Sequence, residues 1–304
     1  MKKAVLLVAH GTVESLDDLP AFLANIRRGH APPDDLVAEV RRRYEAIGGR
    51  SPLLDTSRRL AAKVSALVGV PARVAMRLWH PYPAEVLGEL APGGPLGVAV
   101  VPLAQHSAAI YAGAVREAAA ALPDVKVAAA ANWGLAPGLV AAFAARLERA
   151  LAALGDAARA DTEVLFSAHS LPAAVAASGD PYEHEVRQSA RAIAEATPRI
   201  PEFRVCFQSQ GMSKGPGGRT IEWLGPDLRA ALVDAKARGK RRVVVAPVGF
   251  LSDHVEILYD LDIEAAAWAS ELGISLSRTE SLNDGDDLAR VVADLARPLL
   301  AELG

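Results

Sequence analysis

Hydrophobic residues gather in eight short runs along the chain, separated by longer stretches of helical periodicity. The runs are rich in Val, Ala and Leu and are nearly continuous, which is typical of strands buried on both faces of a parallel sheet. They cover 3–10, 72–79, 97–104, 126–133, 163–170, 203–210, 241–250 and 274–281. Between them, apolar positions recur at helical spacing, most clearly over 57–68, 139–154 and 226–238. This alternation predicts an α/β fold with parallel sheets.

The eight expected strands divide four and four. The stretch 134–138 lies near the midpoint and carries Gly134, Pro137 and Gly138, which suits a crossover between domains. We therefore expect two similar Rossmann-like lobes, each with a four-stranded parallel sheet, around a ligand cleft. The expected boundaries are 1–135 and 136–284, with a final helix in 285–304 that packs back on the first lobe.

Composition narrows the class of protein. A hydrophobic fraction of 51% and a charged fraction of 23% over 304 residues are typical of a globular protein and exclude disordered and fibrous classes. The net charge of -3 and the lack of a basic stripe with interleaved aromatics give no support to nucleic-acid binding. The short basic run 236–242 is better interpreted as a solvated helix end. We expect no nucleic-acid partner.

Two apolar segments superficially resemble targeting or membrane signals. The run 4–9 is too short for a signal peptide and no cleavage site follows it. The charge-free run 127–145 is interrupted by Asn132, Gly134 and Pro137, so we expect no transmembrane segment and a cytoplasmic protein whose membrane contact would be peripheral. Cys206 is the single cysteine, which excludes a disulfide framework and a four-cysteine iron–sulfur cluster within one chain. It is expected to be a buried strand residue.

Polar side chains follow the expected strands. Ligands collect beyond the carboxyl ends of strands in open α/β sheets, so these positions are the first to inspect for chemistry. They carry His10, Trp79, His80, Gln105, His106, Trp133, His169, Ser170, Gln208, Ser209, Ser252, Asp253 and His254. The pattern predicts a histidine-lined ligand site.

The strand-end histidine His169 and a row of carboxylates further along the chain are candidates for one site. A lone histidine at such a position is more often structural than catalytic. Glu256, Asp260 and Glu264 are spaced i, i+4 and i+8, which places them on one helical face. Either Asp253 and Glu256 form a capping box beside two solvated carboxylates, or the row faces His169 in a site for divalent metal or proton removal. The spacing alone leaves both interpretations open.

Two further segments, one basic and one glycine-rich, could bind a ligand. Arg27 and Arg28, with the basic run 41–43, are either helix surface or a clamp for carboxylates of a substrate. The glycine-rich stretch 215–220 fails the GxGxxG register, so we interpret it as a flexible loop. GxxxxGK[ST], GxSxG and HExxH motifs do not occur, which removes the usual support for nucleotide hydrolysis and for serine or zinc hydrolase activity.

Taken in order, the motifs make the chain similar to the ferrochelatase family over nearly its whole length. The matching segments are NIRRG at 25–29, RYEAIGG at 43–49, SPL at 51–53, MRLWHP at 76–81, SAHSLP at 167–172, GDPY at 179–182, QS at 208–209, WLGP at 223–226, PVGF at 247–250, SDHVE at 252–256 and LND at 282–284. The resemblance implies two lobes around a porphyrin cleft and insertion of Fe²⁺ into protoporphyrin IX or coproporphyrin III, with release of two protons. Ferrous iron and porphyrin are then substrates, and no prosthetic group and no iron–sulfur cluster is expected.

The same resemblance assigns roles to residues. His169 and Glu256 become the catalytic pair. The residues implied for metal handling are His169, Glu256, Asp260 and Glu264. Those implied for substrate binding are His10, Arg27, Arg28, Arg43, Tyr44, Ser51 and Gln105. Transient contacts with neighbouring enzymes of the haem pathway would also fit.

Some features depart from the family pattern or leave the function open. His10 stands where related enzymes often carry tyrosine, methionine or an aliphatic residue, and the run 105–107 replaces a more usual tyrosine-containing sequence. The loop 212–220 is longer than the corresponding loop of the family. The cysteine-rich C-terminal extension of cluster-bearing ferrochelatases is missing. Alternative functions are a cobalt or nickel chelatase for another tetrapyrrole and a porphyrin or haem carrier without turnover.

Overall fold

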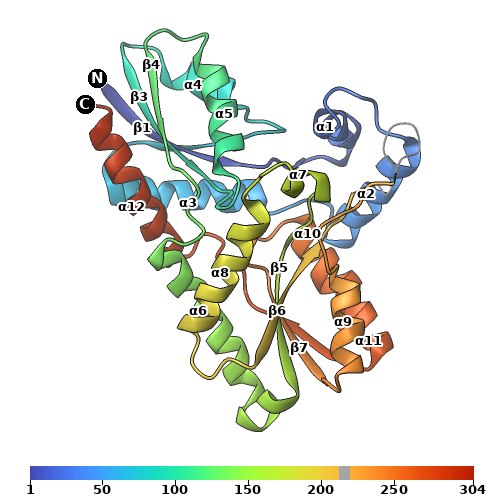
Figure 1. Ribbon diagram of the computed structural model, residues 1–304. Helices are drawn as coiled ribbons and strands as arrows, with labels where there is room; N and C mark the ends of the chain where they lie inside the picture. Colours follow the sequence, from blue (N-terminus) through green and yellow to red (C-terminus); the bar gives the residue numbers. More distant parts are fainter. Residues whose placement is uncertain (212–219) are drawn as a thin grey trace. The chain divides into compact units, whose positions relative to one another are not determined.

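Two compact units make up the protein in a computed structural model that describes residues 1–211 and 220–304. Unit 1 contains Met1–Trp133, Leu251–Val255 and Leu282–Gly304, and unit 2 contains Gly134–Phe250 and Glu256–Ser281. The expected lobes ran 1–135 and 136–284, whereas the contacts place 251–255 and 282–284 with the first unit. Each unit is built around one parallel sheet (Figure 1).

The two sheets share one topology. Their strand orders are β2-β1-β3-β4 and β6-β5-β7-β8, so in each sheet the first strand lies between the second and the third. All pairings between these strands are parallel. The predicted fold class, an α/β fold with two four-stranded parallel sheets, is therefore confirmed. In such sheets the chain changes direction between the two central strands, and ligands bind beyond the carboxyl ends at that point.

All eight predicted runs contain a strand. The strands are β1 (Lys2–Ala9), β2 (Ala72–Met76), β3 (Leu96–Pro102), β4 (Val125–Ala129), β5 (Thr162–His169), β6 (Glu202–Gln208), β7 (Arg242–Ala246) and β8 (Ser275–Arg278). They end earlier than the hydrophobic pattern indicated, by one residue for β1 (9 against 10) and by four for β7 (246 against 250). The polar residues at the ends of the runs therefore lie mostly in the loops that follow the strands.

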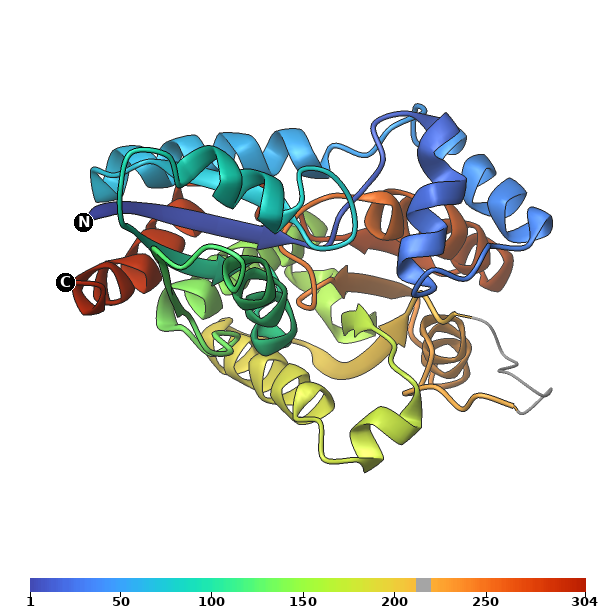
Figure 2. The same cartoon turned by 90° about the horizontal axis from the view of Figure 1, so that it is seen from above.

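Helices cover the sheet of unit 1. They are η1 (Leu16–Asp18), α1 (Leu19–Ile26), α2 (Asp34–Ala46), α3 (Leu53–Val68), α4 (Pro83–Leu90), α5 (Ala108–Ala119) and α12 (Asp286–Glu302). Apolar residues of α4 and α5 form one core cluster with alternate residues of β1 and β3. The C-terminal helix α12 packs on α3 and β3, and Lys3 Nζ donates to the Leu300 carbonyl at 2.7 Å. Both ends of the chain consequently lie close together (Figure 2).

Unit 2 repeats the layered arrangement. Its helical segments are α6 (Pro137–Leu154), η2 (Asp156–Asp161), α7 (Ala173–Ala177), α8 (Tyr182–Ala196), α9 (Leu228–Ala237), α10 (Val255–Leu258), the π-helix η4 (Asp260–Ala265) and α11 (Ala266–Leu272). Figure 1 shows α9 and α11 together on one side of this sheet, and α6 and α8 on the other. Ile257 and Leu261 join α9 and the strands in one buried core cluster. That cluster anchors to the sheet the start of the segment from Glu256 to Glu264, here called the acidic segment.

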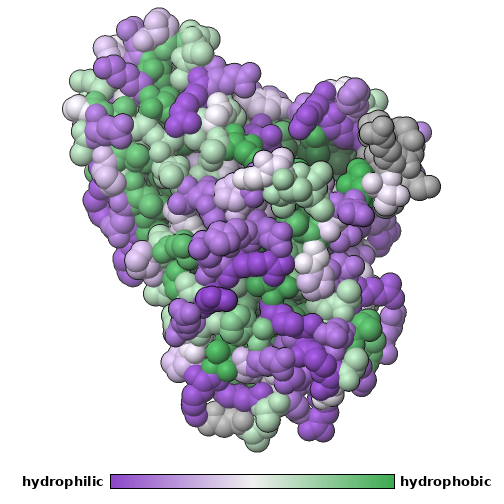
Figure 3. Space-filling view, viewed as in Figure 1, coloured by the Kyte–Doolittle hydropathy of each residue, from purple (hydrophilic) through white to green (hydrophobic). Residues whose placement is uncertain are grey.

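The large exposed apolar side chains among the described residues come from different segments of the chain. Hydrophobic and polar residues are interspersed on the face drawn in Figure 3. The large exposed apolar side chains are Met1, Ile26, Leu67, Ile110, Leu135, Val233 and Ile263. Among the described residues, no helix has the length and apolar character that a membrane span requires.

Candidate functional site

His169 is the last residue of β5, a central strand of unit 2. Its Nδ1 lies 2.5 Å from the carbonyl oxygen of Ser170. Because a carbonyl only accepts, Nδ1 must carry the proton, and the other ring nitrogen of a neutral imidazole is then unprotonated. That nitrogen, Nε2, lies 3.7 Å from Glu256 Oε1, with 36% of the His169 side chain and 30% of the Glu256 side chain exposed. The unit thus presents a base beside a carboxylate, both accessible to a ligand.

The main chain around His169 is held from several sides. Tyr182 Oη donates to the His169 carbonyl at 3.0 Å. The Ser170 amide donates to the Gln208 carbonyl at 2.7 Å, and its buried hydroxyl donates to the Leu224 carbonyl at 2.9 Å. Hydrogen bonds to neighbouring segments fix the strand end, so the imidazole projects from a rigid base.

The acidic segment is not the regular helix that the spacing predicted. It passes from α10 into the π-helix η4, where the Glu264 amide donates to the Tyr259 carbonyl, five residues back, at 2.9 Å. A π-helix has a wider turn than an α-helix, so Glu256, Asp260 and Glu264 do not lie on one regular α-helix. The expected regular helix was wrong for this segment, because nothing in the hydrophobic periodicity marks a widened turn. Such turns occur often at functional sites.

Two adjacent residues at the end of β6 hold this segment. Ser209 Oγ donates to Asp260 Oδ2 at 2.5 Å. Asp260 is buried, with 5% of the residue exposed. Ser209 has φ 58, in the left-handed region that non-glycine residues rarely adopt. Gln208 Nε2 donates to the Glu256 carbonyl at 2.8 Å. The sequence marked Gln208 and Ser209 as strand-end residues but assigned them no role.

The residues expected to handle metal are only partly brought together. His169 and Glu256 are neighbours, whereas Asp260 is engaged with Ser209 and Glu264 lies at a half-buried position further along. Within residues 1–211 and 220–304, no group of three His, Cys, Asp or Glu side chains could hold a metal ion. The four-residue metal set therefore stays a prediction.

In unit 1, His10 follows directly after β1, a central strand of its sheet. The residue is exposed, and its Nδ1 lies 3.1 Å from Tyr111 Oη of α5. The Arg77 guanidinium lies over the Tyr111 ring, 5.8 Å from its centroid. His10 thus occupies the same place in the first sheet that His169 occupies in the second, at the carboxyl end of the strand between the second and third.

The three arginines expected to bind carboxylates differ in their surroundings. Arg28 is exposed just past α1 and has φ 57, in the left-handed region. Arg27 is half-buried. Arg43 Nε donates to Glu39 Oε1 at 2.8 Å across one turn of α2. Hydrogen bonds from Arg42 and from Arg43 lower the pKa of Glu39. The i, i+4 spacing of Glu39 and Arg43 could have predicted this pair from the sequence.

The remaining residues expected to bind substrate are buried in unit 1. Tyr44 is 2% exposed and its hydroxyl lies 2.9 Å from Thr12 Oγ1. Ser51 Oγ accepts from the Leu53 amide at 3.3 Å, and Gln105 is 1% exposed. The contacts of these three residues with a substrate stay predictions. Beside Gln105, His106 is buried too, and burial lowers its pKa to about 4.

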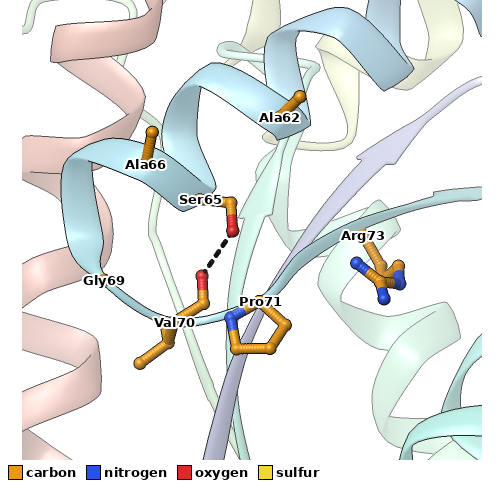
Figure 4. Close-up of a pocket in the computed structure, with 7 residues that line it drawn as sticks. All are labelled: Ala62, Ser65, Ala66, Gly69, Val70, Pro71 and Arg73. Carbon is orange, nitrogen blue, oxygen red and sulfur yellow. Dashed lines mark hydrogen bonds between the residues drawn. The ribbon is translucent and has the colours of Figure 1, made fainter.

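An open hollow of about 600 Å³ lies elsewhere on unit 1. Figure 4 shows its lining residues where α3 ends and β2 begins. They are Ala62, Ser65, Ala66, Gly69, Val70, Pro71 and Arg73. Because β2 starts at Ala72, the hollow is at the amino end of that strand, opposite the end where ligands bind. We do not assign the activity to it.

Cys206 and the glycine-rich loop are the last features that the sequence singled out. The thiol is fully buried in β6, as expected, and burial raises the pKa of Cys206 to about 12, so it stays protonated. The long loop at 212–220 and the glycine-rich stretch at 215–220 lie, except for Thr220, outside the described residues.

The fold has solved counterparts. The structure titled "SirB from Bacillus subtilis with Fe3+" covers 99% of this chain, and 97% of that chain is matched, with a TM-score of 0.62 and 16% sequence identity. At that identity, the likeness shows the fold alone. The class is thus an α/β protein with two repeated parallel-sheet units.

Sequence relatives identify the family. The family model described as Ferrochelatase matches residues 2–299. A protein of Acidobacterium capsulatum named "Ferrochelatase" is 34% identical, with 99% of this chain and 96% of the relative covered. Another, of Anoxybacillus flavithermus, named "Coproporphyrin III ferrochelatase", is 31% identical, with 96% of each covered. The chain belongs to the ferrochelatase family, and it is an enzyme of the porphyrin metal chelatase class.

Proposed function

We propose that the protein inserts Fe²⁺ into a free-base porphyrin, with His169 as proton acceptor and Glu256 as the carboxylate that supports it. The observation that carries the proposal is the pair itself: His169 Nε2 lies 3.7 Å from Glu256 Oε1 while Nδ1 donates to a main-chain carbonyl. That bond leaves the lone pair of Nε2 available to take a proton. The Glu256 carboxylate places a negative charge beside the nitrogen that receives the proton.

The reaction must remove two protons for each iron that enters. A free porphyrin carries two pyrrole N–H groups, and Fe²⁺ forms bonds to the ring nitrogens as those two protons leave. His169 takes a pyrrole proton at Nε2, passes it to solvent and is then ready for the second. In the proposed mechanism Asp260 and Glu264 carry protons or metal along the acidic segment. Imidazole and carboxylate both bind first-row divalent metals, so the pair suits the metal as well as the proton.

A flat porphyrin gives metal poor access to its nitrogens, so the ring has to be held bent. Strain of that kind costs roughly 1–5 kcal/mol and is supplied by contacts remote from the reacting atoms. We propose Arg27, Arg28, Arg43 and Ser51 for the propionate groups, since a guanidinium binds carboxylates in a bidentate manner. His10, Tyr44 and Gln105 are proposed to line the substrate.

The identity of the porphyrin is the finer part of the proposal. Relatives at similar identity are named either ferrochelatase or coproporphyrin III ferrochelatase, so protoporphyrin IX and coproporphyrin III are both proposed substrates. We also propose that catalysis requires no iron–sulfur cluster, because Cys206 is the single cysteine and its thiol is buried and protonated.

An anaerobic assay of the purified protein tests the function. Fe²⁺, Co²⁺ or Ni²⁺ is supplied with protoporphyrin IX, coproporphyrin III or sirohydrochlorin, and metallation is followed by the loss of the free-base absorption bands. Catalytic turnover of Fe²⁺ with one of the first two porphyrins supports the proposal. Turnover confined to Co²⁺ or Ni²⁺ with sirohydrochlorin would replace it with the alternative chelatase. Stoichiometric porphyrin binding without turnover would make the protein a carrier and overturn it.

A further inference from the structure

The side-chain amide of Gln208 bridges β5 to the acidic segment. Ser167 Oγ donates to Gln208 Oε1 at 2.7 Å, and Gln208 Nε2 donates to the Glu256 carbonyl at 2.8 Å. Ser167 is 0% exposed and Gln208 is 4% exposed. A carbonyl only accepts, so the amide nitrogen must face Glu256 and the amide oxygen must face Ser167. The bridge therefore has one orientation, and water has little access to it.

The bridge starts from the strand that carries His169. Ser167 and His169 are two residues apart on β5, and Gln208 pairs with His169 in the register of β5 and β6. Hydrogen bonds of a central strand vary little in geometry. The amide thus ties the main chain of Glu256 to the rigid element from which the imidazole projects.

The segment that carries Glu256 has little helix of its own to fix it. α10 is four residues long, and the π-helix starts two residues after it ends. The next residue, Ile257, is fully buried in the core of unit 2, so the turn stays attached to the sheet without the amide. Removal of the bridge should therefore let the Glu256 carboxylate move without unfolding the unit.

We propose that Gln208 is a positioning residue for metal insertion, which sets the distance between Glu256 and His169 through its hydrogen bond to the Glu256 main chain. This inference rests on the function proposed above. Misplacement of a reacting group by about 1 Å can cost roughly 10²-fold in rate. A loss of positioning should lower kcat and leave porphyrin binding almost unchanged, because Gln208 is only 4% exposed and so presents little surface to a ligand.

The test is a double-mutant cycle on the full-length protein. Gln208→Met keeps the size of the side chain and removes both its donor and its acceptor. We expect kcat for Fe²⁺ insertion to fall roughly 10- to 100-fold, with KM for the porphyrin within about threefold of the wild type. Combined with Glu256→Gln, it should cause no further loss, because the charge that it positions is already absent.

Two more variants separate positioning from folding. Ser167→Ala removes the other anchor of the amide and should lower kcat by a smaller factor, again at nearly constant KM; it serves if Gln208→Met does not fold. Thr197→Val is the matched control, since the Thr197 hydroxyl is buried and donates to the Ile193 carbonyl at 2.7 Å at the end of α8. It should leave kcat and KM unchanged.

The outcomes distinguish the two proposals. Near-normal turnover of a folded Glu256→Gln enzyme would overturn the proposed role of that carboxylate. An impaired Glu256→Gln enzyme, together with normal kcat in both Gln208→Met and Ser167→Ala, would overturn the role of Gln208 alone. Losses that multiply in the double variant would do the same, because Gln208 would then act independently of Glu256.

Discussion

His106 should make the protein less stable as the pH falls from 7 to 5. The residue is 3% exposed, and burial lowers its pKa from 6.5 to about 4. Below pH 6.5 the unfolded chain takes up a proton at this histidine, whereas the native state stays neutral until about pH 4. The contribution of the neutral imidazole to stability is therefore complete above pH 6.5 and is lost as the pH falls towards 4.

The size of the effect follows from the two pKa values. A gap from 6.5 to about 4 corresponds to a limit of about 3 kcal/mol in the free energy of unfolding. By pH 5 the loss through His106 should be about 2 kcal/mol. This is a large fraction of the stability of a typical domain, so urea unfolding at pH 7 and at pH 5 can resolve it.

The assay compares the pH dependence of three proteins. In His106→Gln the site no longer titrates, so the stability difference between pH 7 and pH 5 should be smaller than that of the wild type by about 2 kcal/mol. Other titrating groups contribute to both proteins and cancel. His30→Gln is the control, because His30 is exposed, and it should keep the wild-type difference. An unchanged difference in His106→Gln would refute the reasoning.

Three further predictions concern activity. Arg28→Ala should raise KM for the porphyrin more than it lowers kcat if the guanidinium binds a propionate, as steady-state kinetics can check; an unchanged KM would leave Arg28 a surface residue. Cys206→Ser should keep its activity, and the purified wild type should lack iron–sulfur absorption; inactivity together with a bound cluster in the wild type would contradict this. Glu256→Gln should lower kcat roughly 10²- to 10⁴-fold, whereas Asp260→Asn, which alters only the outer carboxylate, should cost less; equal losses would place the essential carboxylate at Asp260.

The strands could be predicted because their burial leaves a local signature. Strands covered on both faces are nearly continuous apolar runs, and all eight runs contain a strand. The polar residues at the ends of those runs lie at or just after the carboxyl ends of the strands. His169 and Glu256, which lie 87 positions apart in the sequence by their numbers, are neighbours in the structure. Their pairing was inferred from the family motifs and not from spacing.

The rest of the site depends on packing that no local pattern encodes. The π-helix at Asp260–Ala265 widens one turn without changing the apolar periodicity, so the sequence indicated a regular helix through the three carboxylates. Tyr44 follows three arginines and was expected to bind substrate; its side chain is part of a core cluster, which the charges before it do not indicate. The link from Gln208 to Glu256 depends on the pairing of β5 with β6, which becomes visible only once the strand order is known.

The most direct test of the central claim is the rate of Fe²⁺ insertion by His169→Ala, measured anaerobically beside its affinity for the porphyrin. The variant should fold with nearly wild-type thermal stability, because 36% of the His169 side chain is exposed and the strand end is held by other residues. Porphyrin affinity, followed by fluorescence titration, should change little. With the proton acceptor gone, kcat should fall roughly 10²- to 10⁴-fold. A folded His169→Ala enzyme that still inserts iron at close to the wild-type rate would contradict the account.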